Sequence, residues 1–178
     1  IRRQRQMCIR DRNPPVEGPN ADPQHIYYSK HTWDGNTFQV GEQVLISEIG
    51  RNIAADVCVS DNGQRVVIGN TISRDYATGG PDDWTQYNQD IYIWQSYDGG
   101  DTWEEPFNLT DFIPPNENLL PDTTAANQDT LRAYCDCNVY IDHDDILHVA
   151  FTISGYFSLQ GTIYGNHSMV YHLSLIHI

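Results

Sequence analysis

Positively charged residues are scarce in this chain. It has 10 Lys and Arg residues against 24 Asp and Glu residues, and its formal net charge is −14 at pH 7. Proteins bind nucleic acids and anionic membranes through cations, so this composition argues against both as partners. No stretch approaches the roughly 18 consecutive apolar residues of a membrane-spanning helix, which argues against membrane insertion.

Cysteine is also rare, with four residues in the whole chain. Apart from Cys8 near the N-terminus, the cysteines are Cys58, Cys135 and Cys137, an odd number that gives no disulfide framework. No further metal ligands lie at suitable spacing, so small buried side chains are the favoured interpretation. A single disulfide bond from Cys58 to either Cys135 or Cys137 is the alternative.

The two ends of the chain differ from the rest. Residues 2–12 read RRQRQMCIRDR and residues 173–178 read LSLIHI. MCIRD and LSLIHI are translations of one DNA segment read on opposite strands, and that segment resembles the transposon-end adapter of sequencing libraries. A basic arm and an apolar tail are the alternative, which needs two coincidences. We therefore expect 1–12 and 173–178 to be adapter-derived and 13–172 to be the natural segment, an internal fragment.

Without these ends the natural segment is more acidic. Ten basic residues become five and 24 acidic residues become 23, so the formal charge falls from −14 to −18. High acidity with a single lysine, Lys30, suits a soluble protein in salty surroundings.

Strand patterns dominate the chain, and no long segment has a helical period. Strands are predicted at 56–60, 65–73 and 90–96, with a short one at 104–110. The Asn-Gly pair between the first two strands is a strong hairpin signal. Three prolines predict a long loop over 111–130. The fold class expected from the sequence is therefore all-β.

The strand patterns recur along the chain. Residues 59–73 align with 140–154 at an offset of 81, and 26–38 align with 91–103 at an offset of 65. Repeated four-stranded antiparallel units are typical of a β-propeller. We expect a partial β-propeller of about two to three blades: 13–50 the end of one blade, 51–110 a complete blade and 131–172 the start of the next.

The stretch SYDGGDTW, residues 96–103, fits the pattern S-x-D-x-G-x-T-W. Short Ser and Asp side chains bond backbone N–H groups in turns, Gly accepts a positive φ, and Trp buries its ring against the sheet. The stretch resembles the Asp-box, or bacterial neuraminidase repeat, of sialidase-like propellers. The matching residues are Ser96, Asp98, Gly100, Thr102 and Trp103. Upstream, Gly35, Thr37 and Phe38 match, but His31 and Trp33 replace the Ser and Asp.

This resemblance implies an architecture more than a chemistry. In the family, Asp-box turns lie on the rim opposite the ligand face, so Asp98 and Asp101 are expected to be structural. The resemblance implies a secreted or cell-surface bacterial protein that is directed at glycans, as an exo-glycosidase of sialidase type or a carbohydrate-binding relative. The alternative is a non-catalytic interaction or scaffold propeller, and whether the protein is an enzyme stays open.

The ligand face is expected to carry the loops at 46–52, 74–89, 111–134 and 155–167. They are rich in Tyr, Trp, Asp, Asn and Gln, which suits a carbohydrate, although exposed propeller loops often have this composition. The ligand-binding candidates are Arg51, Arg74, Asp75, Tyr76, Trp84, Arg132 and Tyr134.

Among these candidates, the three arginines give the most specific hypothesis. Arg51 and Arg132 stand 81 residues apart, each before an inner strand, and Arg74 enters the same face. Sialidase-like enzymes hold a substrate carboxylate with such a cluster through bidentate bonds. Pairing of each Arg with a local acid is the alternative. No residue is assigned a catalytic role, because nothing selects Asp75 or Tyr134 and the Arg-Ile-Pro motif is absent from this fragment.

No cofactor is expected from the sequence. His143 and His148 straddle a hairpin and His167 lies near a loop, which favours no metal site. The acidic stretch 142–145 suits either Ca²⁺ or a solvated turn, and the turn is the favoured interpretation.

Overall fold

The computed structural model of the chain describes residues 6–11, 25–47, 55–73, 89–112, 131–154, 157–159, 162–164 and 168–175. Every regular element in these ranges is a β-strand, and every strand pair is antiparallel. The all-β expectation is therefore confirmed. Within the same ranges, no helix is long and apolar enough to cross a membrane.

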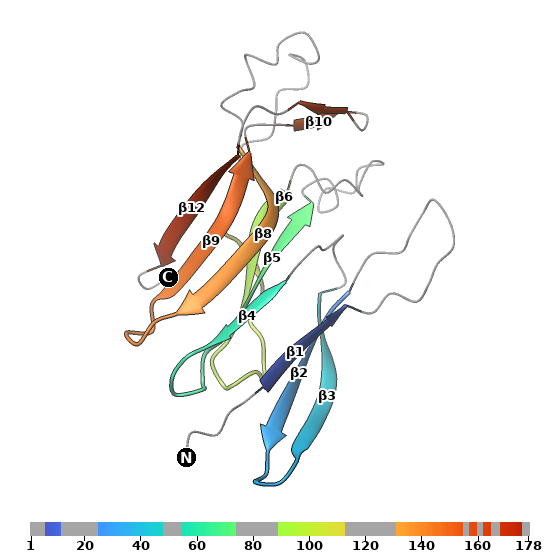
Figure 1. Cartoon of the computed structure of the whole chain (residues 1–178), viewed down its shortest axis with the longest axis vertical. Coiled ribbons are helices and arrows are strands. Elements are labelled where there is room, and N and C mark those ends of the chain that lie inside the picture. Colours follow the sequence, from blue (N-terminus) through green and yellow to red (C-terminus); the bar gives the residue numbers. More distant parts are fainter. Residues whose placement is uncertain are drawn as a thin grey trace, which may run out of the picture.

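Three strands form a sheet of their own in the order β1-β2-β3 (Figure 1). They are β1 (Gln6–Asp11), β2 (Ile26–Trp33) and β3 (Phe38–Ser47). β1 lies in the segment that the sequence suggests is adapter-derived. An edge strand pairs through its backbone groups, so β2 can accept an extended segment of almost any sequence.

The next four strands pair in chain order. They are β4 (Asp56–Val59), β5 (Val66–Ser73), β6 (Gln89–Ser96) and β7 (Phe107–Asn108). β4, β5 and β6 lie close to the predicted ranges. Residues 91–96 pair only with β5 and β7 among the described residues.

β7 is shorter than the predicted strand at 104–110, because side chains replace part of the ladder. Asn108 Oδ1 accepts the N–H groups of Thr110 and Asp111, at 3.2 and 2.9 Å. The Thr110 hydroxyl in turn accepts the N–H of Ile91 at 3.1 Å. Asn and Thr compete in this way with regular strand pairing.

The last large strands are β8 (Arg132–Ile141), β9 (Leu147–Ser154) and β12 (Ser168–Leu175). They pair in the order β12-β9-β8, and one residue pair, Gln89 with Ala133, joins β8 to β6. The expected natural segment ends at His172, and β12 extends three residues beyond it, to Leu175. A small hairpin, β10 (Phe157–Leu159) with β11 (Thr162–Tyr164), forms inside 155–167, which the sequence suggests is a loop.

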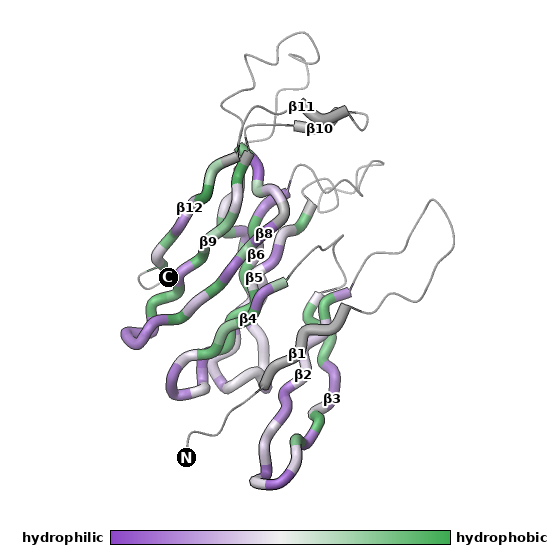
Figure 2. Tube along the Cα trace, viewed as in Figure 1, coloured by the Kyte–Doolittle hydropathy of each residue, from purple (hydrophilic) through white to green (hydrophobic). Residues whose placement is uncertain are grey.

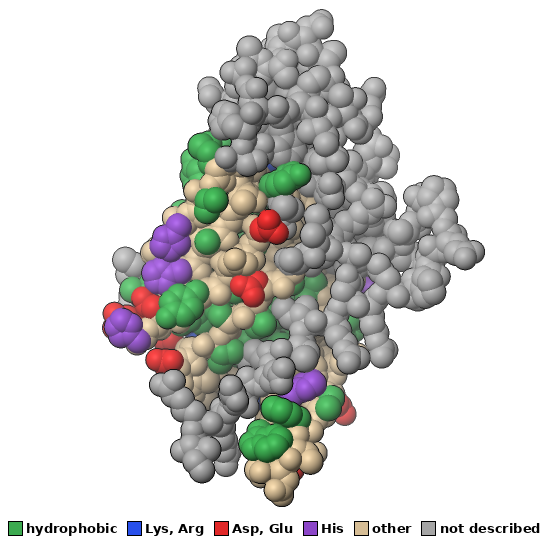
Figure 3. Space-filling view, in the orientation of Figure 1, with side chains coloured by type: hydrophobic (Ala, Val, Ile, Leu, Met, Phe, Trp, Pro, Cys, Tyr) green, Lys and Arg blue, Asp and Glu red, His purple; other side chains and the backbone are tan. Residues whose placement is uncertain are grey.

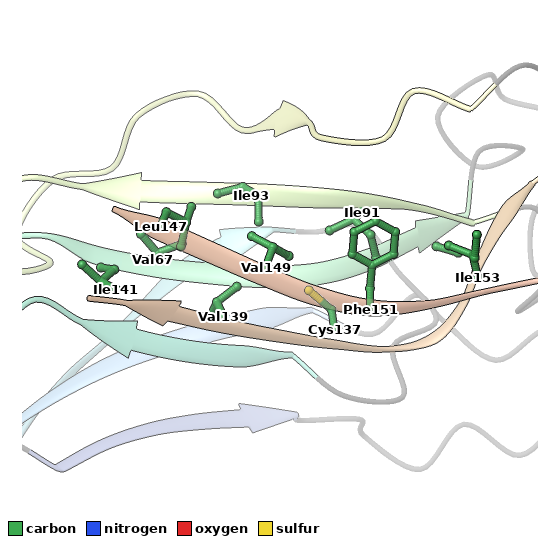
Figure 4. Packing of buried hydrophobic residues seen from close by; sticks show 11 residues of the cluster. Val67, Ile91, Ile93, Cys137, Val139, Ile141, Leu147, Val149, Phe151 and Ile153 are labelled. Carbon is green, nitrogen blue, oxygen red and sulfur yellow. The ribbon is translucent and has the colours of Figure 1, made fainter. Parts of the chain in front are cut away.

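β5 and β6 are buried on both faces. Val67, Ile91 and Ile93 pack against β8 and β9, in the cluster drawn in Figure 4. Val66, Ile68 and Trp94 pack on the opposite face, with Ile26 and Tyr28 of β2. Burial on both faces explains why β5 reads as a nearly continuous apolar run instead of an alternating one.

The outward faces of this stack are partly apolar. On β3, Val40 is 74% exposed, and Phe38, Val44 and Leu45 are also exposed. Beyond β8 and β9, Val170 of β12 is 75% exposed beside Met169 and Tyr171. Apolar patches of this kind mark surfaces that other elements cover.

The strands define two ends of the molecule. The turn end carries the turns 34–37, 60–65, 97–102 and 142–146, which are hydrophilic in Figure 2. At the opposite end, here called the loop end, β3, β5 and β9 finish and β4, β6 and β8 begin.

Candidate ligand site at the loop end

The turn 97–102 is closed by its own side chains. Asp98 Oδ1 accepts the backbone N–H groups of Asp101 and Thr102, at 3.0 and 2.8 Å, and Oδ2 accepts the Thr102 hydroxyl. Ser96 Oγ donates to Asp98 at 2.8 Å and accepts the N–H of Gly100 at 2.8 Å. The bonds from Thr102 come first among those that hold the pKa of Asp98 below its ordinary value. The carboxylate is thus committed to the turn.

The same turn presses against the neighbouring sheet. Gly100 has a φ of 90°, and a Cβ placed there would overlap the Tyr28 ring. Trp103 meets Tyr28 edge to face at a centroid distance of 5.0 Å. Asp101 forms an ion pair with Lys30 of β2, at 2.9 Å. These contacts give the turn a packing role between two sheets.

Asp34 closes the upstream turn, and the sequence alignment missed it. Its Oδ1 accepts the N–H groups of Asn36 and Thr37, at 2.8 and 2.9 Å. These backbone bonds, led by that of Thr37, lower its pKa to about 2. The alignment placed Trp33 at this position because it assumed equal turn lengths. Asp34 lies three positions before Thr37, whereas Asp98 lies four positions before Thr102. An alignment that allowed a turn one residue shorter would have identified Asp34.

A third carboxylate closes the turn 142–146. Asp142 Oδ1 accepts the N–H groups of Asp144 and Ile146, both at 2.9 Å. A hydrogen bond with His148 is the largest cause that holds the pKa of Asp142 below its ordinary value. Among the described residues, no group of three or more His, Cys, Asp or Glu side chains is arranged to hold a metal ion.

Bonds between turns connect the turn end laterally. Gly99 donates its N–H to the carbonyl of Gln64 at 2.7 Å. Arg65 donates to the carbonyl of Asp145 at 2.5 Å and to Gln95 Oε1 at 2.7 Å. Sequence reasoning gave Arg65 no role, although it joins the turn between β4 and β5 to the turn between β8 and β9.

Most of the predicted ligand residues lie outside the described residues: Arg51, Arg74, Asp75, Tyr76 and Trp84. Arg132 and Tyr134 are described, both on β8 at the loop end. Arg132 is only 1% exposed, and its Nη1 donates to the carbonyl of Leu131 at 2.6 Å. Tyr134 is 39% exposed.

Three polar residues that sequence reasoning missed are fully buried at the loop end. Asn70, Thr71 and Gln89 are each 0% exposed. Within the structure as described, the amide atoms of Asn70 and Gln89 and the hydroxyl of Thr71 have no hydrogen-bond partner. The available signal was the polar pair Asn-Thr inside an otherwise apolar strand. Buried unpaired polar groups are rare and costly, and they often mark functional positions.

The register brings part of this polar group together. Thr71 lies opposite Ile91 and Gln89 opposite Ser73, so Thr71 and Gln89 are diagonal neighbours on one face. Gln89 also pairs with Ala133, the residue after Arg132. Asn70 projects to the other face of β5 because successive side chains alternate.

Asp90, next to Gln89, is buried but bonded. It is 1% exposed, and its carboxylate accepts the Asn108 amide at 2.9 Å and the Thr110 hydroxyl at 2.8 Å. The N–H of Phe112 adds a third bond at 3.1 Å. Asp90 therefore anchors the segment after β7 and is not a free carboxylate.

The described cysteines are free thiols. Cys58 and Cys137 form no disulfide with each other, and the side chain of Cys135 lies outside the described residues. Burial is the main cause that raises the pKa of each thiol to about 12. Both thiols therefore stay protonated at neutral pH, which makes them poor nucleophiles.

Comparison with known protein families finds no match for this chain, and comparison with curated proteins finds none.

Proposed function

We propose that the chain is part of a secreted Asp-box β-propeller whose loop end binds a carbohydrate, as an exo-glycosidase of sialidase type or a binding relative. Face-to-face sheets and carboxylate-closed turns at a single end support this architecture. The exposed apolar faces of β3 and β12 would then be covered by further sheets of a longer protein.

The observation that carries the binding proposal is the burial of the Thr71 and Gln89 side chains without hydrogen-bond partners at the loop end, where Gln89 pairs with Ala133, the residue after Arg132. Amide and hydroxyl groups bond sugar hydroxyls, and a guanidinium binds a carboxylate through two parallel bonds. A ligand that reached Thr71 and Gln89 would supply the hydrogen-bond partners that these two side chains lack. An acidic sugar matches this mixture of groups best.

Binding of acidic and neutral glycans to the 178-residue chain tests this proposal, with ligand-observed NMR as the readout. Arg132→Lys is expected to weaken binding of acidic glycans about tenfold, because Lys has no planar fork, and to affect neutral glycans little. Gln89→Leu is expected to weaken both. Asp101→Asn, at the turn end, is the matched control and should bind as the wild type does. Equal losses in the control and Arg132→Lys would refute a site at the loop end.

One observation favours the second candidate, an interaction or scaffold propeller without catalysis. The Arg132 guanidinium is buried and already donates to a backbone carbonyl, as an arginine that braces a strand does. Absence of glycan binding in the wild-type chain, together with a destabilised Arg132→Lys variant, would favour this candidate.

A further inference from the structure

A groove of about 350 Å³ lies on the outward face of β8, β9 and β12, far along the strands from the loop end. Figure 3 shows histidine side chains gathered beside hydrophobic ones on this face. The groove is lined by Asn138, Val139, Tyr140, His148, Ala150 and His172. Asp142 of the adjacent turn bonds His148, but neither the carbohydrate proposal nor the turns account for the pairing of the two histidines.

The two histidines face each other within a chain of polar contacts. His148 Nδ1 lies 3.1 Å from His172 Nε2, and the ring planes are nearly parallel, with 14° between them. On the other side of the ring, His148 Nε2 lies 3.0 Å from Asp142 Oδ2. Ser174 Oγ lies 2.9 Å from His148 Nδ1.

Asp142 selects the tautomer of His148. An ionised carboxylate can only accept hydrogen bonds, so the proton of neutral His148 resides on Nε2. Nδ1 then carries a lone pair that faces His172. A carboxylate that orients the far nitrogen of an imidazole is the usual outer support of a metal-binding histidine.

We propose that His148 Nδ1 and His172 Nε2 together bind one divalent transition-metal ion such as Cu²⁺ or Zn²⁺. Metal–nitrogen bonds of about 2.0–2.1 Å place two adjacent ligand nitrogens about 2.8–3.4 Å apart, from right-angled to tetrahedral coordination, and the observed 3.1 Å lies in this range. The ion replaces the proton that the two nitrogens share. Each ring must turn so that both lone pairs converge on one side of the line between the two nitrogens.

The donor set determines the class of ion. Imidazole nitrogens suit Cu²⁺, Zn²⁺ and Ni²⁺, whereas Ca²⁺ and Mg²⁺ require oxygen ligands. Two protein ligands leave the remaining positions to water or a small anion, for which the groove has room. This site does not depend on the carbohydrate proposal. In a longer protein with a further sheet on this face, the ion would lie between two sheets.

Electron paramagnetic resonance of Cu²⁺ bound to the untagged chain tests the proposal, because it counts coordinated nitrogens. The wild type is expected to bind one Cu²⁺ with a two-nitrogen signature, and His172→Ala and His148→Ala should each remove one nitrogen. Asp142→Asn keeps an oxygen for the backbone bonds of its turn but presents an N–H to His148. It is expected to weaken binding about tenfold.

His143→Ala is the matched control, since His143 lies on the adjacent turn, is largely exposed and is outside the groove. It should leave affinity and spectrum unchanged. His172 is exposed, so its replacement should preserve the β-sheet circular dichroism signal, which verifies folding. Copper binding that survives both groove substitutions, or that falls equally in His143→Ala, would overturn the site. Wild-type affinity in Asp142→Asn would overturn the role of the carboxylate.

Discussion

The two ends of the sheets treat polar groups in opposite ways. At the turn end, Ser96 and Asp98 bond to each other and to backbone N–H groups within a few residues. At the loop end, Asn70, Thr71 and Gln89 are fully buried without partners. Trp103 is an exception at the turn end, because its indole N–H is buried without a hydrogen-bond partner. The bonded side chains of the turn end therefore contribute stability, whereas the unpaired side chains of the loop end reduce it.

Such a division is physically reasonable for a binding protein. Polar groups that hydrogen-bond to a ligand have no hydrogen-bond partner when the ligand is absent, and this lowers the stability of the ligand-free protein. The turns hold the strands in place from the other end and need no ligand. Substitutions at the two ends should therefore change stability in different directions, and the following predictions test this.

The largest effect is expected at Gly100. Gly100→Ala should destabilise the protein by about 3 kcal/mol, because φ is positive and the new Cβ would displace the Tyr28 ring. Gly35→Ala is the control: its φ is 112°, but no atom lies within 4 Å of the added Cβ, so only backbone strain of about 1–2 kcal/mol is expected. Urea denaturation measures both. Equal losses would show that the contact between turn and sheet contributes nothing.

Acid should weaken the turn end. Asp34 has its pKa lowered from 3.8 to about 2, so its ionised form is favoured in the folded state. A lowered pKa contributes stability that is present above the unfolded pKa and is lost as the pH falls from about 4 to about 2. The melting temperature measured across this range should fall less steeply for Asp34→Asn than for the wild type. Parallel curves for the two proteins would contradict the role of Asp34.

Two nearly isosteric substitutions should shift stability in opposite directions. Thr71→Val removes an unpaired buried hydroxyl and is expected to stabilise the protein by about 1 kcal/mol. Ser96→Ala removes a buried hydroxyl that bonds Asp98 and Gly100, and should cost about 1 kcal/mol. Calorimetric melting of both variants gives the comparison. Destabilisation by Thr71→Val would mean that its hydroxyl has a partner and that the contrast between the ends fails.

The smallest effect is expected from the ion pair between Lys30 and Asp101. The two side chains are 27% and 69% exposed, so water and salt screen their attraction. A double-mutant cycle with Lys30→Met and Asp101→Asn should give a coupling of about 0.5 kcal/mol or less, which decreases at high salt. A coupling that salt leaves unchanged would place the pair in a drier environment than its exposure indicates.

Local sequence patterns predicted the strands well and the turn lengths less well. The pairing of β4 with β5 follows from apolar runs separated by an Asn-Gly turn, and the pairing of β6 with β7 follows from the Asp-Gly-Gly turn between them. β7 is shorter than predicted because the side chains of Asn108 and Thr110 accept backbone N–H groups. Strand propensity does not include this competition with strand pairing. Asp34 escaped the alignment because one residue fewer separates it from its threonine.

The sequence by itself determined the strand patterns and the closure of the turn at 97–102, because those signals lie within a few positions of one another. Whether a polar strand residue is buried without a partner depends on the sheets that cover it. Only the tertiary structure therefore decided that Thr71 and Gln89 meet beside β8 at the loop end. It also decided that His148 faces His172, because the register of β9 with β12 brings together residues 24 positions apart.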